Sequence, residues 1–375
     1  MNIGWIYPHR ERCGIARYAM NYAEALGTIE PVRHINPDWH RNDRKQLRSV
    51  LDECDIVHLQ YDTIAFMNGT TDFLRPLMHS IRVPTIVSLH EVYDENPLVY
   101  PRSALRGNPV TLALKKLLWD QAHPVEKTWR SHLAASFHAR LLLVHHRYHR
   151  EILTANGINE TMVTIQPMPV HRLQPPTPFT YAAGMPLRLG GHGFIQSAYD
   201  FDLLFSTLGH LRIPWQFTWI GGTRTADQEP LHRELLHRIQ ERGWSDRFTI
   251  TGWIDEQTLP EHLAGVDCML ALFKHRSSSA SISRMLSYGK PVIATDLQMT
   301  REIADANRTS RRSTAAPLLV TPMDPGKTAE QIMLFTENGD LRLRLYEGIN
   351  AYVHDHSFEK MAHRLVDLYR KLLAE

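Results

Sequence analysis

The stretch FKHRSSSASISRMLSYGKPVIATD, residues 273–296, brings together side chains that could bind an anion. Lys274, His275 and Arg276 come directly before a run of serines, and the segment after the serines has helical spacing. Serines cap helix starts, where free N–H groups and the helix dipole attract phosphate, and nearby cations add to this attraction. We therefore predict a phosphate site here, with a solvated serine loop as the alternative. The residues assigned to it are Lys274, Arg276, Ser279 and Ser281.

Two glycine-rich turns, GGHG at 190–193 and GGTR at 221–224, follow predicted strands in the second half of the chain. Because glycine has no side chain, the backbone at these turns could approach a phosphate or a base closely. The arginine of the second turn could pair with an anion. The residues predicted to contact the ligand here are Gly191, Gly193, Gly222 and Arg224.

Polar residues also follow strands of the first half. Gly14, in CGIAR, opens a predicted helix after the first strand, where free N–H groups could face a ligand. His90 and Glu91 end the strand PTIVSLH and could hold a sugar or exchange a proton. We assign Gly14, His90 and Glu91 to the reaction. The alternatives are a plain turn at Gly14, which lacks the GxGxxG pattern of dinucleotide sites, and a buried, hydrogen-bonded histidine.

The 22 histidines raise the question of a metal site. The best cluster is HHRYHRE, with His146 and His149 about one helical turn apart and Glu151 nearby. A helix start at the protein surface explains this cluster better, so we predict no metal site.

Short apolar runs alternate with helical patterns along the whole chain, which predicts an α/β protein with two Rossmann-like, doubly wound parallel-sheet domains. The predicted divisions are an N-terminal domain at 1–170, a proline-rich linker at 171–184 and a C-terminal domain at 185–356. An amphipathic helix at 357–374 could pack back on the first domain. Ligands bind at the carboxyl ends of such sheets, so we expect both domains to face a central cleft. The predicted strands are residues 2–7, 55–60, 84–90, 140–146, 162–167, 186–192, 215–221, 247–251, 268–273, 291–296 and 317–322.

Residues 91–125 interrupt this alternation with a long insertion that contains VTLALKKLLW. Insertions of this length inside compact domains are usually functional or mobile. One interpretation is a helical insertion that completes the domain surface. The other is an element that binds the acceptor or makes a peripheral contact with a membrane.

Composition excludes several classes of protein. At 375 residues with 43% apolar and 22% charged residues, the chain is globular and too long for a single core. A net charge of +2 gives no electrostatic case for a nucleic-acid partner. Three cysteines without metal-type spacing fit the reducing cytoplasm. We find no signal peptide and no apolar run long enough for a transmembrane helix.

Six segments occur in order over nearly the whole chain: CGIARYAMNYAEAL, IVHLQYD, TIVSLHE, FTITGWIDEQTLPEHLAGVDCMLALF, YGKPVIATDLQMTREIA and PLLVTPMDP. With these segments the chain resembles a GT-B fold glycosyltransferase, most similar to the large retaining family 4. The resemblance implies transfer of a sugar from a nucleoside-diphosphate sugar, as co-substrate and without a further cofactor, to a saccharide or lipid-linked acceptor. It also implies that the C-terminal domain binds the donor and the N-terminal domain the acceptor, mostly without metal.

The sequence departs from that family where the donor binds. Arg276 and Arg284 stand where family members have a Glu-x7-Glu pair, and Tyr199 and Asp200 stand where they have Lys-Gly. We hypothesise that Lys274, Arg276 and Arg284 supply the positive charge that is missing at Tyr199. Gly14 and His90 match the family, near the phosphates and the transferred sugar, whereas Glu91 replaces an aspartate.

Three functions follow from these observations. The first is an active transferase in cell-surface polysaccharide or glycoconjugate synthesis, located in the cytoplasm or at the inner face of the plasma membrane. The second is a nucleotide or sugar-phosphate binding protein of the same fold without transferase activity. The third is an unrelated two-domain α/β enzyme, such as an epimerase or a phosphorylase.

Overall fold

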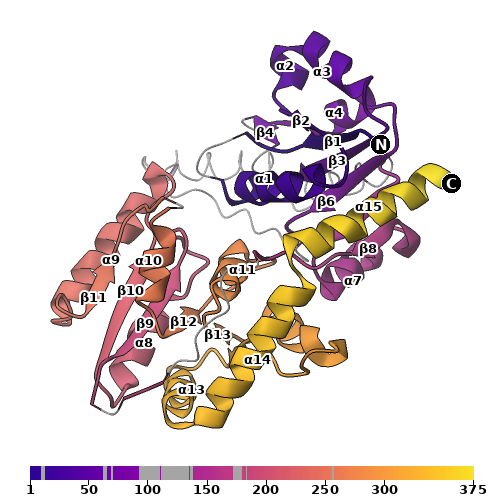
Figure 1. Ribbon diagram of the computed structural model, residues 1–375. Helices are drawn as coiled ribbons and strands as arrows, with labels where there is room; N and C mark the ends of the chain where they lie inside the picture. Colours follow the sequence, from indigo (N-terminus) through magenta and orange to yellow (C-terminus); the bar gives the residue numbers. More distant parts are fainter. Residues whose placement is uncertain are drawn as a thin grey trace. The chain divides into compact units, whose positions relative to one another are not determined.

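The computed structural model of the protein resolves two compact units (Figure 1). The first contains Met1–Met168 and Phe358–Glu375, and the second contains Pro169–Ser357. Most of the predicted linker and of the 91–125 insertion lies outside the described residues. The structure describes residues 1–9, 13–61, 66–68, 71–92, 110, 135, 138–171, 180–182, 184–255 and 257–375.

The first unit is built on a six-stranded sheet in the order β2-β1-β3-β6-β7-β8, in which every neighbouring pair is parallel. The direction of winding reverses between β1 and β3, and open α/β sheets bind ligands at the carboxyl ends beside such a reversal. Its strands are β1 (Ile3–Ile6), β2 (Val32–Ile35), β3 (Ile56–Tyr61), β6 (Thr85–Leu89), β7 (Leu141–Val144) and β8 (Val163–Ile165), with a separate pair β4 (Met67–Asn68) and β5 (Thr71–Asp72). Its helices are α1 (Gly14–Gly27), α2 (Trp39–Asn42), α3 (Arg44–Leu51), α4 (Leu74–Ser80), α7 (Arg147–Ala155) and α15 (Phe358–Ala374), with a 3-10 turn η2 (Glu160–Met162).

Alternate residues of these strands face two separate apolar cores, because side chains of a strand point to opposite faces in turn. On the face covered by α1 and α15, β3 begins with the apolar residue Ile56 and continues with His58 and Gln60. The neighbouring β6 changes in the same way, from Ile86 to Ser88. A buried polar region therefore occupies the carboxyl end of this face.

The C-terminal helix α15 belongs to the first unit and lies beside α1 (Figure 1). The Tyr22 hydroxyl of α1 donates to the Met361 carbonyl of α15 at 3.0 Å. Farther along α15, the Tyr369 hydroxyl forms a short hydrogen bond with His58 Nδ1. The last helix thus supports the buried polar region of the sheet.

The second unit contains a six-stranded parallel sheet in the order β11-β10-β9-β12-β13-β14, which reverses between β9 and β12. Its strands are β9 (Leu187–His192), β10 (Trp215–Ile220), β11 (Phe248–Ile250), β12 (Cys268–Ala271), β13 (Val292–Thr295) and β14 (Leu319–Thr321). Its helices are α8 (Phe201–His210), α9 (Glu229–Glu241), α10 (Leu259–Ala264), α11 (Ala280–Ser287), α12 (Gln298–Asp305), α13 (Pro325–Glu337) and α14 (Gly339–Asp355), with 3-10 turns η3 (Ala226–Gln228) and η4 (Ala306–Thr309).

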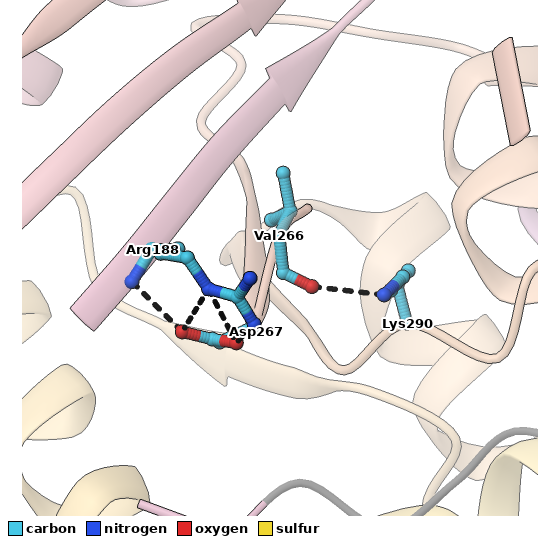
Figure 2. Close-up of polar contacts among 4 residues, drawn as sticks. All are labelled: Arg188, Val266, Asp267 and Lys290. Carbon is cyan, nitrogen blue, oxygen red and sulfur yellow. Dashed lines mark hydrogen bonds and ion pairs between the residues drawn. The ribbon is translucent and has the colours of Figure 1, made fainter. Parts of the chain in front are cut away.

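At the amino edge of this second sheet, polar contacts connect residues at the beginnings of neighbouring strands (Figure 2). Arg188 Nε lies 3.1 Å from Asp267 Oδ1, and the Arg188 backbone N–H donates to the same carboxylate at 2.9 Å. Lys290 Nζ donates to the Val266 carbonyl at 2.9 Å, and burial lowers the pKa of this lysine. These groups are structural, because ligands of such sheets bind at the carboxyl edge.

The two doubly wound α/β units confirm the predicted fold class, and every predicted strand is present. The prediction missed β2, whose residues Arg33 and His34 are exposed. An edge strand with so little apolar surface carries no hydrophobic pattern to detect.

Candidate functional site

In the first unit, the loop after β1 leads into α1 at Gly14, directly after the N-cap residue Cys13. A Cβ atom built on Gly14 would have no atom within 4 Å among the described residues. The first N–H groups of a helix have no acceptor inside the helix. Among the described residues, the backbone at Gly14 therefore offers donors that no neighbouring side chain covers, and its role in ligand binding stays a prediction.

His90 follows β6 and is 3% exposed, while Glu91 is half-buried. His90 Nε2 lies 2.9 Å from Gln60 Oε1, and its Nδ1 lies 3.1 Å from His145 Nε2. Burial, followed by the nearby His145 and His58, holds the pKa of His90 well below its ordinary value. His90 is thus the buried, hydrogen-bonded histidine that we considered as an alternative. It is also neutral at pH 7 and lies at the sheet edge where a ligand would bind.

The prediction that HHRYHRE starts a helix at the surface is only half right. The helix α7 does begin at Arg147, but His145, His146 and His149 are all buried. Burial lowers the pKa of His146 to about 3, so this side chain stays neutral. Among the described residues, no group of three or more His, Cys, Asp or Glu side chains is arranged to hold a metal ion.

In the second unit, hydrogen bonds hold the loop between β12 and α11 in place. The buried Thr295 hydroxyl accepts from the Phe273 N–H at 2.9 Å and donates to the Phe273 carbonyl at 2.8 Å. The Lys274 N–H donates to the Ala198 carbonyl at 2.9 Å. Ser279 caps α11, because its Oγ accepts from the Ile282 N–H at 3.2 Å. The start of α11 is therefore a fixed array of N–H donors.

Ser281 joins the start of α11 to the end of β9, where the sheet reverses. Its hydroxyl donates to the His192 carbonyl and accepts from His192 Nδ1 at 3.2 Å. Burial, and then the charge of Arg284, lower the pKa of His192 to about 4. The hydroxyls of Ser279 and Ser281, both assigned to ligand binding, have protein partners and fix the helix start.

The cations of this loop differ in their surroundings. Lys274 Nζ lies 3.6 Å from Asp202 Oδ2 and 3.9 Å from Asp200 Oδ1, so two carboxylates balance its charge. Arg276 is half-buried, its guanidinium carbon lies 6.0 Å from the centre of the Phe273 ring, and no carboxylate among the described residues pairs with it. Arg276 is therefore the better placed of the two to bind an anion.

Ser278 is a member of this site that the sequence analysis did not single out. Its side chain is 6% exposed, and its Oγ has no hydrogen-bond partner among the described residues. Buried hydroxyls in native proteins nearly always have a partner, so this hydroxyl could donate to a bound ligand. The serine run was the only signal for it in the sequence.

Glycines at the carboxyl ends of β9 and β10 allow close backbone packing. Gly221 has a φ of +137°, and a Cβ there would lie 2.2 Å from the Gly193 carbonyl oxygen. A Cβ on Gly222 would lie 2.9 Å from the Trp253 nitrogen, and one on Gly191 would lie 2.6 Å from the Trp219 ring. The predicted ligand residues Gly191 and Gly222 thus have packing reasons to be glycine.

Beside these glycines lies an aromatic ledge formed by Phe194, Trp253 and Arg224. The rings of Phe194 and Trp253 are stacked, with centroids 5.8 Å apart and an interplanar angle of 16°. The Arg224 guanidinium carbon lies 5.8 Å from the centre of the Phe194 ring, and Trp253 is 49% exposed. An exposed aromatic face with an arginine suits stacking of a planar base.

Residues 192–338 match the family model described as "Glycosyl transferases group 1". No curated protein sequence matches the chain significantly. This matched segment contains the start of α11, Arg276, Ser278 and the aromatic ledge.

Solved structures with this fold cover nearly the whole chain. Anabaena Alr3699/HepE in complex with UDP-glucose has a TM-score of 0.69 at 12% identity, covering 99% of this chain and 100% of its own. Sucrose-phosphate synthase from Thermosynechococcus elongatus has a TM-score of 0.68 at 14% identity, covering 100% of this chain and 99% of its own. A glycosyltransferase from Rickettsia africae ESF-5 has a TM-score of 0.67 at 13% identity, covering 99% and 98%. The protein therefore has the GT-B fold.

Proposed function

We propose that the protein is a glycosyltransferase that moves a sugar from a nucleoside-diphosphate sugar to a saccharide or lipid-linked acceptor. The observation that carries the proposal is the start of α11, where Arg276 and the Ser278 hydroxyl, which has no partner among the described residues, accompany a capped array of backbone donors. The match to the group 1 glycosyltransferase model spans this segment, and Alr3699/HepE was solved with UDP-glucose. The ledge at Phe194 and Trp253 would carry the base of the donor.

In the proposed reaction, the bond between the anomeric carbon and the diphosphate oxygen breaks, and negative charge develops on the leaving diphosphate. Arg276 and the N–H groups of α11 stabilise that charge, which is the main catalytic contribution. The acceptor hydroxyl attacks on the face that the diphosphate leaves, so the configuration is retained, and its proton goes to the departing phosphate. No side chain has to act as nucleophile, and no metal ion is included in the proposal.

In the first unit, Gly14, His90 and Glu91 are proposed to bind the sugars. A neutral imidazole can accept a hydrogen bond from a sugar hydroxyl without attracting a competing anion. The proposal places the enzyme in cell-surface polysaccharide or glycoconjugate synthesis, in the cytoplasm or at the inner face of the plasma membrane. Among the described helices, none has both the length and the apolar character needed to cross a membrane.

Calorimetric titration with UDP, GDP, ADP, TDP and CMP tests the donor site. We expect one nucleoside diphosphate to bind, and Arg276→Ala to weaken that binding by more than about tenfold, because a charge-assisted contact contributes about 1.5–3 kcal/mol. Arg308→Ala, which removes an exposed arginine paired with Asp305, is the matched control and should bind normally. Absence of binding to every nucleotide would overturn the proposal.

The second candidate is a nucleotide or sugar-phosphate binding protein that has lost transfer activity. It is favoured by Arg276 and Arg284, which stand where the resembled family has its glutamate pair. Incubation with nucleotide sugars and analysis of released nucleotide separate the two functions. Transfer or hydrolysis of any nucleotide sugar would exclude the inactive protein.

A further inference from the structure

A line of hydrogen bonds runs along the carboxyl edge of the first unit's sheet, across four neighbouring strands. The Gln166 carbonyl, after β8, lies 3.1 Å from His145 Nδ1. His145 Nε2, after β7, lies 3.1 Å from His90 Nδ1, and His90 Nε2, after β6, lies 2.9 Å from the side chain of Gln60 in β3. The proposed function uses only His90 from this line.

The carbonyl at one end of the line determines where the hydrogens lie. A carbonyl oxygen can only accept, so His145 Nδ1 must carry a hydrogen, and neutral His145 then has its lone pair at Nε2. Burial lowers the pKa of His145 to about 4, so the ring is neutral at pH 7. His90 Nδ1 must therefore donate to His145, which leaves the lone pair of neutral His90 at Nε2.

Gln60 completes the line. The residue is fully buried, and its amide nitrogen has no hydrogen-bond partner among the described residues. A half-turn of the amide places this nitrogen beside the His90 lone pair, so that each group gains a partner. If His90 took up a proton at Nε2, the amide oxygen would be the matching partner instead. The two orientations of the Gln60 amide thus correspond to the two protonation states of His90.

We propose that His145 and Gln60 are positioning residues that act through His90. His145, held by the Gln166 carbonyl, keeps the hydrogen of His90 on Nδ1, and Gln60 occupies Nε2 until a sugar hydroxyl donates to that nitrogen. Among the described residues, the other aromatic or titratable groups near the His90 ring include Tyr18 of α1, with ring centroids 4.9 Å apart, and His58 of β3. Only the part of the inference that concerns the sugar hydroxyl rests on the proposed function. The position of the hydrogen on His90 does not depend on that function.

Gln166, whose carbonyl lies at one end of this line of hydrogen bonds, is itself held in place by the last helix. The Gln166 side chain donates to the Met361 carbonyl of α15 at 3.2 Å and to the Tyr22 hydroxyl of α1. Its backbone N–H donates to the Val144 carbonyl at 2.8 Å. These contacts hold the carbonyl that sets the direction of every hydrogen bond in the line.

Nitrogen-15 NMR of histidine-labelled protein tests the inference without any substrate, with the His90 signals assigned from a His90→Gln variant. In the unaltered protein at neutral pH, we expect a protonated Nδ1 and an unprotonated Nε2 at His90. His145→Leu removes the acceptor for Nδ1, so the hydrogen should move to Nε2 and face the Gln60 amide oxygen. His145→Gln retains an acceptor and should restore the original form. His146→Leu, at another buried histidine, should leave His90 unchanged.

A hydrogen on Nε2 of His90 in the unaltered protein would overturn the inference, even if His145→Leu did not fold. With a substrate in hand, His145→Leu should lower kcat about tenfold, the equivalent of about one hydrogen bond, with little change in donor KM, and His145→Gln should restore most of it. An unchanged kcat would also count against the inference. Failure to turn over any nucleotide sugar, with the NMR result as expected, would remove the proposed function alone.

Discussion

The carboxyl edges of the two sheets differ in how they present polar groups, although both sheets are doubly wound in the same way. In the first unit the polar groups are buried, neutral imidazoles that hydrogen-bond to one another. In the second unit they include Arg224, Arg276 and the start of α11, next to an exposed tryptophan, together with the imidazole of His192. Neutral donors and acceptors suit sugar hydroxyls, whereas permanent charge and helix N–H groups suit a diphosphate.

The largest expected difference between the units is their response to acid. Burial lowers the pKa of His58 to about 3 and that of His145 to about 4, from an ordinary value of 6.5. Below pH 6.5 the unfolded chain takes up protons that the folded unit does not, so the free energy of unfolding falls as the pH falls toward 4. Each such histidine contributes a slope of up to about 1.4 kcal/mol per pH unit.

Scanning calorimetry between pH 7 and 4 checks this prediction. We expect the transition of the first unit to move to lower temperature faster than that of the second, which has His192 as a comparable group. His145→Gln should flatten the dependence, because one titrating ring is gone. Equal shifts of both transitions would contradict the contrast between the two edges.

The next effect concerns the glycine packing of the second unit. Gly221→Ala would force a side chain into a φ of +137° and into the Gly193 carbonyl oxygen. Backbone strain of this kind costs about 1–3 kcal/mol, so we expect the free energy of unfolding to fall by about 3 kcal/mol. Gly209→Ala, in α8, is the control: its Cβ would meet no atom of the described residues within 4 Å, so it should stabilise the unit by about 0.5–1 kcal/mol. Urea unfolding measures both, and equal midpoints for the two variants would show that the close contact at Gly221 is unimportant.

Much of the fold could be predicted because each buried strand is an apolar run between turn residues. The same alternation could have identified Gln60, one of the two positioning residues. In IVHLQY and TIVSLH, polar residues recur at every second position near the strand end, which puts His58, Gln60, Ser88 and His90 on one face. The serine run likewise predicted a capped helix start, and Ser279 caps it.

Contacts between distant segments explain what the sequence could not reveal. Lys274 was expected to hold an anion, but Asp200 and Asp202, far away in the chain, balance its charge. Tyr199, at a position where the resembled family has lysine, is buried and donates to the Leu270 carbonyl at 2.9 Å. Such pairings depend on how loops meet, and no local pattern specifies them.

Smaller effects on stability and nucleotide affinity should distinguish the serines that contact a ligand from those that stabilise the helix start. Ser278→Ala removes a hydroxyl without a partner among the described residues, so the stability of the free protein should stay within about 0.5 kcal/mol. Nucleotide affinity should fall about fivefold if that hydroxyl donates to a phosphate. Ser279→Ala, which loses the cap of α11, should instead destabilise the free protein by about 1 kcal/mol. Calorimetric titration and thermal unfolding distinguish the two, and an unchanged affinity in Ser278→Ala would remove this residue from the site.

A small change in stability is expected at Gly14, where a Cβ would have no atom within 4 Å among the described residues. Among the described residues, the added Cβ of Gly14→Ala would meet no atom within 4 Å, and neither would that of Gly27→Ala at the other end of α1. Both should raise the free energy of unfolding by no more than about 1 kcal/mol, since alanine loses less entropy than glycine in a helix. Only Gly14→Ala should raise the KM for a sugar substrate, because a methyl group there would occupy the space beside the helix N–H groups. Equal kinetics in both variants would mean that Gly14 merely starts a helix, and binding in the first unit would then depend on its imidazoles.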